Sequence, residues 1–220
     1  MKPKHHPDTS TLLSYAAGSL PEPLAMVTAC HLSHRTQCRN LLHDADQIGS
    51  MLLDDITPTS VSVSVKQSLL ARLDSVETIK VPLPKATRFP QQSLRDIPYP
   101  LNTILGSSLE TLEWKTLVPG IKQHLISTSS DGHLRLLNIS PGTSIPEHSH
   151  TGSELTLIIK GSITDETGQY CVGDMADLGP DIQHQPVVDT SEACICLVAT
   201  DAPLRFKHWV PRMLQPLLKI

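Results

Sequence analysis

The sequence predicts an α+β, multidomain protein, in which a small helical bundle at residues 1–80 is followed by a β-barrel at residues 104–205. Three observations lead to this prediction. Apolar residues recur at helical spacing in the first part of the chain, and they alternate with a period of two in the last part. Between these parts, five prolines lie within positions 82–100. The last residues, 206–220, are then expected to form a C-terminal tail.

Three helices are expected in the first fifty residues. The first begins at Thr11 and ends at Gly18, because glycine is favoured just after the last turn of a helix. The second begins near Pro23, and the third runs from Cys38 to a stop near Gly49. In each of them apolar side chains recur at the spacing of one helix face.

A fourth helix is the clearest of the set. The tetrapeptide Ser64-Val65-Lys66-Gln67 has the form of a capping box, in which a serine and a glutamine satisfy backbone groups at a helix start. The alternation of valine and serine in residues 61–65 also fits a strand. The cap favours a helix, and so does the apolar stripe that follows it, which consists of Leu69, Leu70, Leu73 and Val76.

Residues 81–103 are expected to form a linker or an extended strap, because proline has no backbone donor for a helix or a central sheet ladder. After this stretch, short apolar runs at 134–139, 155–159 and 194–199 are separated by turn signals such as Pro141-Gly142. Many short strands with glycine and proline turns between them predict a β-sandwich or a β-barrel.

Composition excludes several function classes. The net charge is −4 and no block of consecutive basic residues occurs, which argues against direct nucleic-acid binding through phosphate contacts. No segment has the roughly 20 apolar residues of a membrane span, and the N-terminus lacks the apolar region of a signal peptide. The five cysteines are an odd number, which favours a reducing compartment. The sequence therefore predicts a cytoplasmic protein without a membrane partner.

A candidate metal site lies in the barrel part. His148 and His150 are two residues apart on an extended segment, so they point to the same side, and Glu154 does so if the alternation continues. His184, one hairpin later, is the candidate fourth ligand. Three imidazoles and a carboxylate bind divalent transition metals, and this set accepts zinc, iron, manganese, nickel or copper.

These residues carry a resemblance to the cupin family. The pattern Gly142-x5-His148-x-His150-x3-Glu154-x6-Gly161 is similar to the first cupin motif in full. The run from Gly173 through Pro180 to His184 resembles a looser second motif, without its usual second glycine and final asparagine. The resemblance implies a double-stranded β-helix. Many cupins are oxygenases or isomerases with an open coordination position, whereas four protein ligands fit a structural or sensing zinc.

A second group of candidate ligands lies in the helical part. His6, His31 and Cys38 resemble the zinc-binding anti-sigma domain, whose pattern is His-x3-Cys-x2-Cys with a further histidine upstream. Arg35 stands where the middle cysteine is expected and cannot ligate a metal, and His34, one position earlier, is its candidate replacement. The site is equally compatible with three ligands or with no metal. In the last case, an apolar core holds the helices and Cys38 is a small buried side chain.

The combination of the two halves resembles the ChrR-type anti-sigma factors over almost the whole chain, from His5-His6 to the segments Cys194–Phe206 and Pro211–Pro216. The resemblance implies that the helical domain binds and inhibits a sigma factor of the extracytoplasmic-function class. The barrel, with zinc as its metal and a second zinc in the helical domain, would detect singlet oxygen or an organic peroxide and trigger release.

Two alternatives remain at this point. Cys194 and Cys196 face the same side of a strand, so both are candidate redox residues beside the metal, although buried strand cysteines are more often inert packing. The chain is expected to be a regulator rather than an enzyme. The competing hypothesis is a metal-dependent cupin dioxygenase or lyase with a helical extension, for which iron or manganese with an exchangeable water would be the sign.

Overall fold

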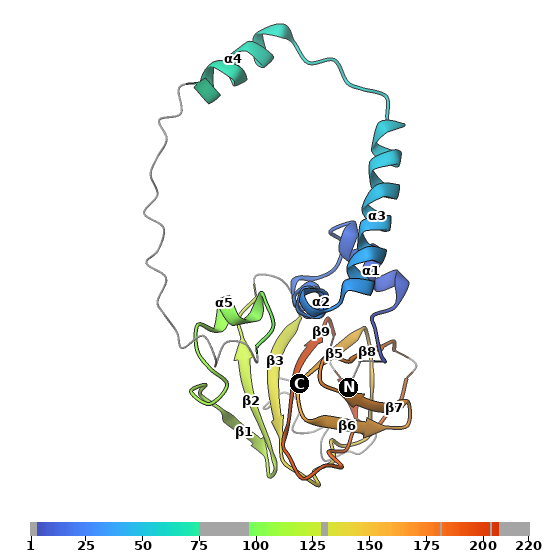
Figure 1. Ribbon diagram of the computed structural model, residues 1–220, viewed down its shortest axis with the longest axis vertical. Coiled ribbons are helices and arrows are strands. Elements are labelled where there is room, and N and C mark those ends of the chain that lie inside the picture. The colour runs from blue at the N-terminus through green and yellow to red at the C-terminus, as the bar shows by residue number, and fades with distance from the viewer. Residues whose placement is uncertain (1–3, 75–96, 129–131, 181, 203, 207–220) are drawn as a thin grey trace.

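The computed structural model describes residues 4–74, 97–128, 132–180, 182–202 and 204–206, and the structural statements below concern these residues. A β-barrel forms the base of the molecule, a group of helices lies on one side of it, and the helical segment of residues 36–74 extends away from it (Figure 1). The predicted α+β class is therefore confirmed.

The four helices expected in the first part are all present, but two of their limits were predicted wrongly. They are α1 (Thr9–Ala16), α2 (Glu22–His34), α3 (Thr36–Asp54) and α4 (Val63–Asp74).

The helix α3 does not stop at Gly49, because nothing forces this glycine out of helical geometry, and it continues for another five residues. The helix α4 begins before the predicted cap. The hydroxyl of Ser62, not of Ser64, accepts the backbone N–H of Val65 at 3.3 Å. Val76, at the end of the predicted stripe, lies outside the described residues.

The barrel is built from one six-stranded antiparallel sheet and two two-stranded sheets. In spatial order, the large sheet contains β1 (Lys115–Val118), β2 (Ile121–Ile126), β3 (His133–Ile139), β9 (Cys194–Thr200), β5 (Glu154–Lys160) and β8 (Met175–Leu178). The small sheets pair β4 (His148–His150) with β10 (Leu204–Phe206), and β6 (Ser162–Asp165) with β7 (Gly168–Cys171).

The turn between β5 and β6 requires the last glycine of the first cupin motif. Gly161 has a φ of 73°, in the left-handed region that disfavours side chains. A Cβ at this position would also lie 2.7 Å from the carbonyl oxygen of Ala193. Glycine at this position therefore lets the chain turn after β5 in close contact with Ala193 and the start of β9.

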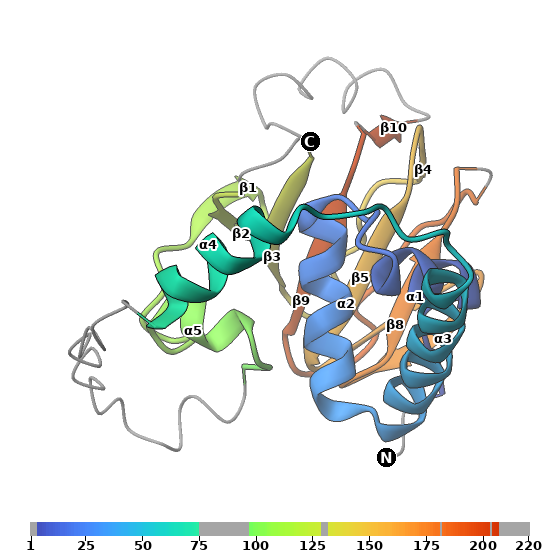
Figure 2. The same cartoon turned by 90° about the horizontal axis from the view of Figure 1, so that it is seen from above.

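Alternation along the central strand β9 separates two apolar cores. The even residues Cys194, Cys196 and Val198 face the barrel interior, together with Ile139 and Ile158. The odd residues of the strand face outward and form a second core with α2. Figure 2 shows α2 lying across β5 and β9, so the helical part does not stand apart from the barrel.

The end of the predicted linker also belongs to the outer core. The short helix α5 (Leu101–Leu105) follows Ile97, and the side chains of Ile97 and Leu101 are fully buried against the barrel. The rest of the predicted linker, and the predicted tail from residue 207 onward, lie outside the described residues.

The shared outer core leads to a stability prediction. Replacing Leu197 by Ala removes a fully buried side chain between β9 and α2, and we expect the free energy of unfolding to fall by about 2–5 kcal/mol. The matched change Leu52→Ala, on an exposed face of α3, should change it by less than about 0.5 kcal/mol. Urea titration followed by tryptophan fluorescence measures both, and equal effects would contradict the assignment of the core.

Candidate metal centres

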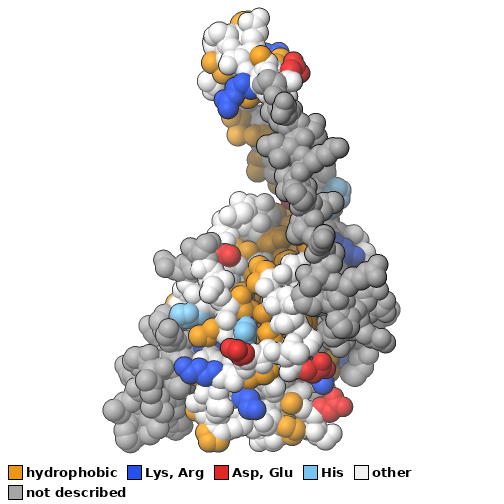
Figure 3. Space-filling view, turned by 90° about the vertical axis from the view of Figure 1, so that its left-hand side faces the viewer, with side chains coloured by type: hydrophobic (Ala, Val, Ile, Leu, Met, Phe, Trp, Pro, Cys, Tyr) orange, Lys and Arg blue, Asp and Glu red, His pale blue; other side chains and the backbone are white. Residues whose placement is uncertain are grey.

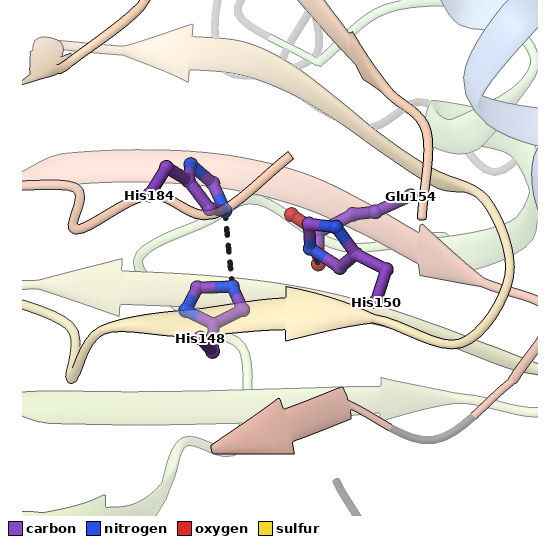
Figure 4. Close-up of side chains that lie close together, drawn as sticks. All are labelled: His148, His150, Glu154 and His184. Carbon is purple, nitrogen blue, oxygen red and sulfur yellow. Dashed lines mark hydrogen bonds and ion pairs between the residues drawn. The ribbon is translucent and has the colours of Figure 1, made fainter. Parts of the chain in front are cut away.

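The structure brings the four predicted barrel ligands together. His148 and His150 come from β4, Glu154 is the first residue of β5, and His184 lies between β8 and β9. All four side chains are buried, and their ligand atoms lie within 4.8 Å of one another. Figure 4 shows the side chains pointing toward a common centre. Two backbone hydrogen bonds between His148 and His184, of 3.1 and 3.2 Å, hold the opposing segments side by side.

Hydrogen bonds hold the rings of His148 and His184 so that their inner nitrogens face each other. His148 Nδ1 donates to the carbonyl oxygen of Pro146 at 2.9 Å, and His184 Nδ1 donates to Asp165 Oδ2 at 2.8 Å. The two Nε2 atoms then face each other at 3.1 Å. Burial lowers the pKa of His148, although Glu154 opposes this, so the ring is neutral at pH 7. The two Nε2 atoms share a hydrogen bond if one of them carries a proton, and a metal ion that displaced this proton would be bound by both nitrogens.

The carboxylate of Glu154 completes the donor set. Burial alone would raise its pKa, but His150, with Nε2 at 3.2 Å from Glu154 Oε2, and the neighbouring rings of His148 and His184 lower the pKa to about 2. The group is therefore ionised at neutral pH. His150 Nε2 faces the carboxylate of Glu154 without a well-aligned hydrogen bond, so a metal ion lying between the two groups could be bound by both.

Two residues of this site were not predicted from the sequence. Asp165 orients His184, but the two residues are 19 positions apart and only the closure of the barrel joins them. Arg135 lies buried in β3, where burial lowers its pKa to about 10 and Glu154 opposes this. A charged residue in the largely apolar run 134–139 was a signal that could have identified it.

The second predicted group also forms a cluster. His6 precedes α1, His31 lies near the end of α2, and Cys38 lies near the start of α3. His6 Nδ1 is 3.4 Å from His31 Nε2, and Cys38 Sγ is 3.4 Å from His31 Nε2 and 3.5 Å from His6 Nδ1. The structure does not bring His34 into this cluster, and its side chain is exposed.

The distances within this cluster fit zinc. Tetrahedral zinc with bonds of ~2.0–2.1 Å to nitrogen and ~2.3 Å to sulfur places two nitrogens ~3.3 Å apart and a nitrogen and a sulfur ~3.5 Å apart. The three donor atoms therefore lie at three corners of such a tetrahedron. Burial, with smaller contributions from His6 and Arg35, lowers the pKa of His31 to about 4, so its ring is neutral and able to coordinate at pH 7.

Comparison with known proteins decides the family. The chain is 36% identical over 217 residues to the anti-sigma-E factor ChrR of Cereibacter sphaeroides, and the match covers 99% of each chain. The chain belongs to the ChrR family of anti-sigma factors. The model of the ChrR cupin-like domain matches residues 105–203.

A solved structure supports the same assignment. The crystal structure of Rhodobacter sphaeroides SigE in complex with the anti-sigma ChrR matches with a TM-score of 0.75 and 33% identity, over 90% of this chain and 99% of that one. Membership of the ChrR family makes the chain a regulator rather than the dioxygenase or lyase of the competing hypothesis. None of the helices in the described ranges is long and apolar enough to cross a membrane.

In this ChrR relative, a short N-terminal tether, residues 4–8, runs along the barrel. The backbone N–H groups of Lys4 and His5 donate to Asp174 Oδ1 at 2.6 and 3.0 Å, and the His5 carbonyl accepts the N–H of Met175. The next residue of the tether, His6, belongs to the cluster on the helices. The tether therefore joins that cluster to β8.

A chain of side-chain contacts continues from the tether to the barrel centre. The ring of His5 lies on that of Tyr170, with centroids 4.3 Å apart. Tyr170 Oη and Thr167 Oγ1 are 2.7 Å apart, and Thr167 Oγ1 donates to Asp165 Oδ1. Because Asp165 also holds His184, the two centres are connected through four side chains.

The candidate redox cysteines face the barrel interior, as predicted. A hydrogen bond with Cys194 and burial raise the pKa of Cys196 well above its usual value. Its thiol is therefore protonated at neutral pH in the absence of a nearby cation.

The contact between Asp165 and His184 leads to a prediction about metal affinity. Changing Asp165 to Asn removes the charge that orients His184 and makes its Nε2 more basic, so we expect the barrel centre to bind zinc roughly 10–100-fold more weakly. The matched change Asp189→Asn affects only a hydrogen bond to Thr164 and should leave the affinity unchanged. Competition with a zinc-binding dye measures both affinities, and unchanged binding in Asp165→Asn would contradict the assigned role.

Proposed function

We propose that the chain is an anti-sigma factor that binds a sigma factor of the extracytoplasmic-function class through α3 and α4. In this proposal the barrel holds zinc and responds to an oxidative signal, singlet oxygen or an organic peroxide, by releasing the sigma factor. Both proteins would act in the cytoplasm, where transcription takes place.

The observation that carries the first part is a run of exposed apolar side chains on the projecting segment. Eleven large apolar residues between positions 48 and 73 are each 50–73% exposed, and α4 has no buried residue. Figure 3 shows apolar side chains on the surface of this projection. They are Ile48, Met51, Leu52, Leu53, Ile56, Val61, Val63, Val65, Leu69, Leu70 and Leu73.

Such a surface is typical of a protein-binding segment. A soluble chain rarely exposes a continuous apolar patch unless a partner covers it. Val65, Leu69 and Leu73 lie at i, i+4 and i+8 of α4, which is the pattern of a helix that lies in an apolar groove of its partner. The similar ChrR structure is a complex with SigE, which supports a sigma factor as the partner here.

The apolar stripe gives a direct test of sigma-factor binding. Changing Leu69 to Glu places a charge in the proposed interface, and we expect the full-length chain to bind its sigma factor at least about tenfold more weakly, a loss of ~1.4 kcal/mol. The control is Leu125→Glu, an equally large exposed leucine on β2 of the barrel. Co-purification and biolayer interferometry compare them, and equal binding by both variants would refute the interface.

The second part of the proposal rests on the barrel centre and its connection to the helices. Loss of one ligand would remove the cation that stabilises the facing nitrogens of His148 and His184. Movement of His184 would disturb Asp165, and through Thr167 and Tyr170 it would reach the tether beside His6. This route supports release of the sigma factor as a consequence of damage to the barrel centre.

The buried pair Cys194 and Cys196 is a less suitable first target for the oxidant. Peroxides react with thiolates, and the surroundings of Cys196 favour its protonated form. Zinc itself has no redox chemistry, so we assign the first oxidative step to addition of singlet oxygen to a histidine ring of the barrel centre, and to the cysteine pair mainly a role in packing the barrel interior.

A single histidine substitution tests the sensing role. We expect His148→Ala, which removes one ligand, to resemble the damaged centre: it should bind the sigma factor more weakly than the wild type in the dark and show little further release under photosensitised oxidation. The control is His124→Ala, which removes a histidine on β2 outside both clusters. The fraction of complex remaining after illumination with a photosensitising dye is the readout, and release at the wild-type rate from His148→Ala would exclude the barrel centre as the sensor.

A further inference from the structure

Arg35 stands at the sequence position where the family resemblance places a fourth donor, and its positive charge acts on the cluster on the helices. Arg35 lies at the junction between α2 and α3, with φ and ψ of −120° and 98°. Its Nε atom is buried and has no hydrogen-bond partner among the described residues. Its charge also acts on the cluster itself, because it lowers the pKa of His31 and opposes the rise that burial causes in the pKa of Cys38.

The described residues offer no fourth donor to this cluster. The group of ligand atoms within mutual reach contains only His6, His31 and Cys38. These atoms occupy three corners of a tetrahedron, so a bound divalent metal would have one open position. Two neutral imidazoles and one thiolate leave a net charge of about +1 on the metal site. Arg35 adds another positive charge nearby, which the carboxylate of Asp174 opposes at His31. An anion at the fourth position would offset this repulsion.

Small anions have access to this part of the molecule. A cavity of about 1040 Å³ lies between the end of α2 and the barrel, and both His31 and Arg35 line it. The other charged or titratable groups in its wall are His34, Lys160 and Glu110, together with the thiol of Cys30. Two permanent cations against one carboxylate favour the entry of anions.

We propose that this chain binds a divalent metal at His6, His31 and Cys38 and fills the fourth coordination position with a small monodentate anion, such as hydroxide or a halide, held by Arg35. The buried Nε–H of Arg35 then gains the acceptor that it otherwise lacks. The metal at this site is exchangeable, and its affinity depends on the anion in solution. This inference concerns the cluster alone and does not depend on sigma-factor binding.

Cobalt(II) is the probe for this site in the full-length protein. A thiolate bound to cobalt gives a charge-transfer band, and this band reports only the helix cluster because the donors of the barrel centre include no cysteine. Cobalt in the barrel centre would also give visible bands, so every protein compared, including the one that is wild type at the helix cluster, carries His148→Ala, and the remaining visible bands then report the fourth ligand of the helix cluster. We expect azide, added to cobalt-loaded protein in a nitrate buffer, to shift the visible bands of the wild type in a saturable way.

Four variants test whether the fourth ligand of the cluster is an anion or a side chain of the protein. Arg35→Ala should still bind cobalt but show roughly tenfold weaker azide affinity, as expected for the loss of one charge-assisted hydrogen bond. Arg35→Cys should show a charge-transfer band about twice as strong, from two thiolates, and no response to azide. The matched control Arg39→Ala removes an exposed arginine that contacts Leu32 and Thr36, and should respond like the wild type. His34→Ala should also respond like the wild type.

Three results would overturn the proposal. The first is the absence of a thiolate–cobalt band in the wild type when Arg35→Cys shows one, which would mean that the natural cluster holds no metal. The second is a wild-type spectrum that does not respond to azide or chloride. The third is a change of the visible bands in His34→Ala, which would identify His34 as the fourth ligand.

Discussion

The two central strands of the sheet, β5 and β9, are buried on both faces, and the rest of the structure depends on this constraint. Side chains alternate between the faces of a strand, so one set of residues closes the barrel interior while the other forms the base on which α2 packs. The carboxylate of Glu154 enters the barrel centre from the first position of β5. The same strands therefore position the metal ligands and the helical part.

The docking of α2 and the N-terminal tether place the two candidate centres in a fixed relation. Leu24 and Val27 of α2 share the outer core with β9, while Asp174 holds the backbone of the tether. Asp174 has a third contact, because its other oxygen accepts the N–H of Cys171 at 2.8 Å. One buried carboxylate thus joins the β7–β8 turn to the segment that carries His6. This provides a short physical connection between the barrel and the helix cluster.

The projecting part of the helical region differs from α2, because its large apolar side chains are exposed. The start of α3 packs through Cys38 and Leu42 against α1 and α2, but the apolar side chains beyond Ile48 are exposed. Apolar burial provides most of the stability of a helix in a protein, so α4 without a partner lacks that contribution. A surface of this kind is stabilised when another protein covers it, which is consistent with membership of a family of anti-sigma factors.

The helix cluster shows how one substitution changes the chemistry of a site without disturbing its shape. Arg35 stands at the position where a cysteine ligand is expected, yet the other three donors keep distances suited to tetrahedral zinc. The backbone turn between α2 and α3 and the small core of Leu12, Leu32 and Cys38 hold these donors in place. The geometry of the cluster therefore comes from the packing of the helices and does not require a fourth ligand.

The sequence by itself determined the features that depend on local order. The change of period from helical to alternating predicted the fold class, and the spacing of His148 and His150 predicted two side chains on one face, because alternate residues of a strand have a fixed geometry. The alternation does not continue to Glu154, which begins the next strand, so the turn between β4 and β5 places its carboxylate. Only the tertiary structure decided which distant groups meet. It paired Asp165 with His184, left His34 outside the helix cluster and placed α2 on the barrel. These contacts join residues far apart in the chain, and local spacing carries no information about how the chain closes on itself.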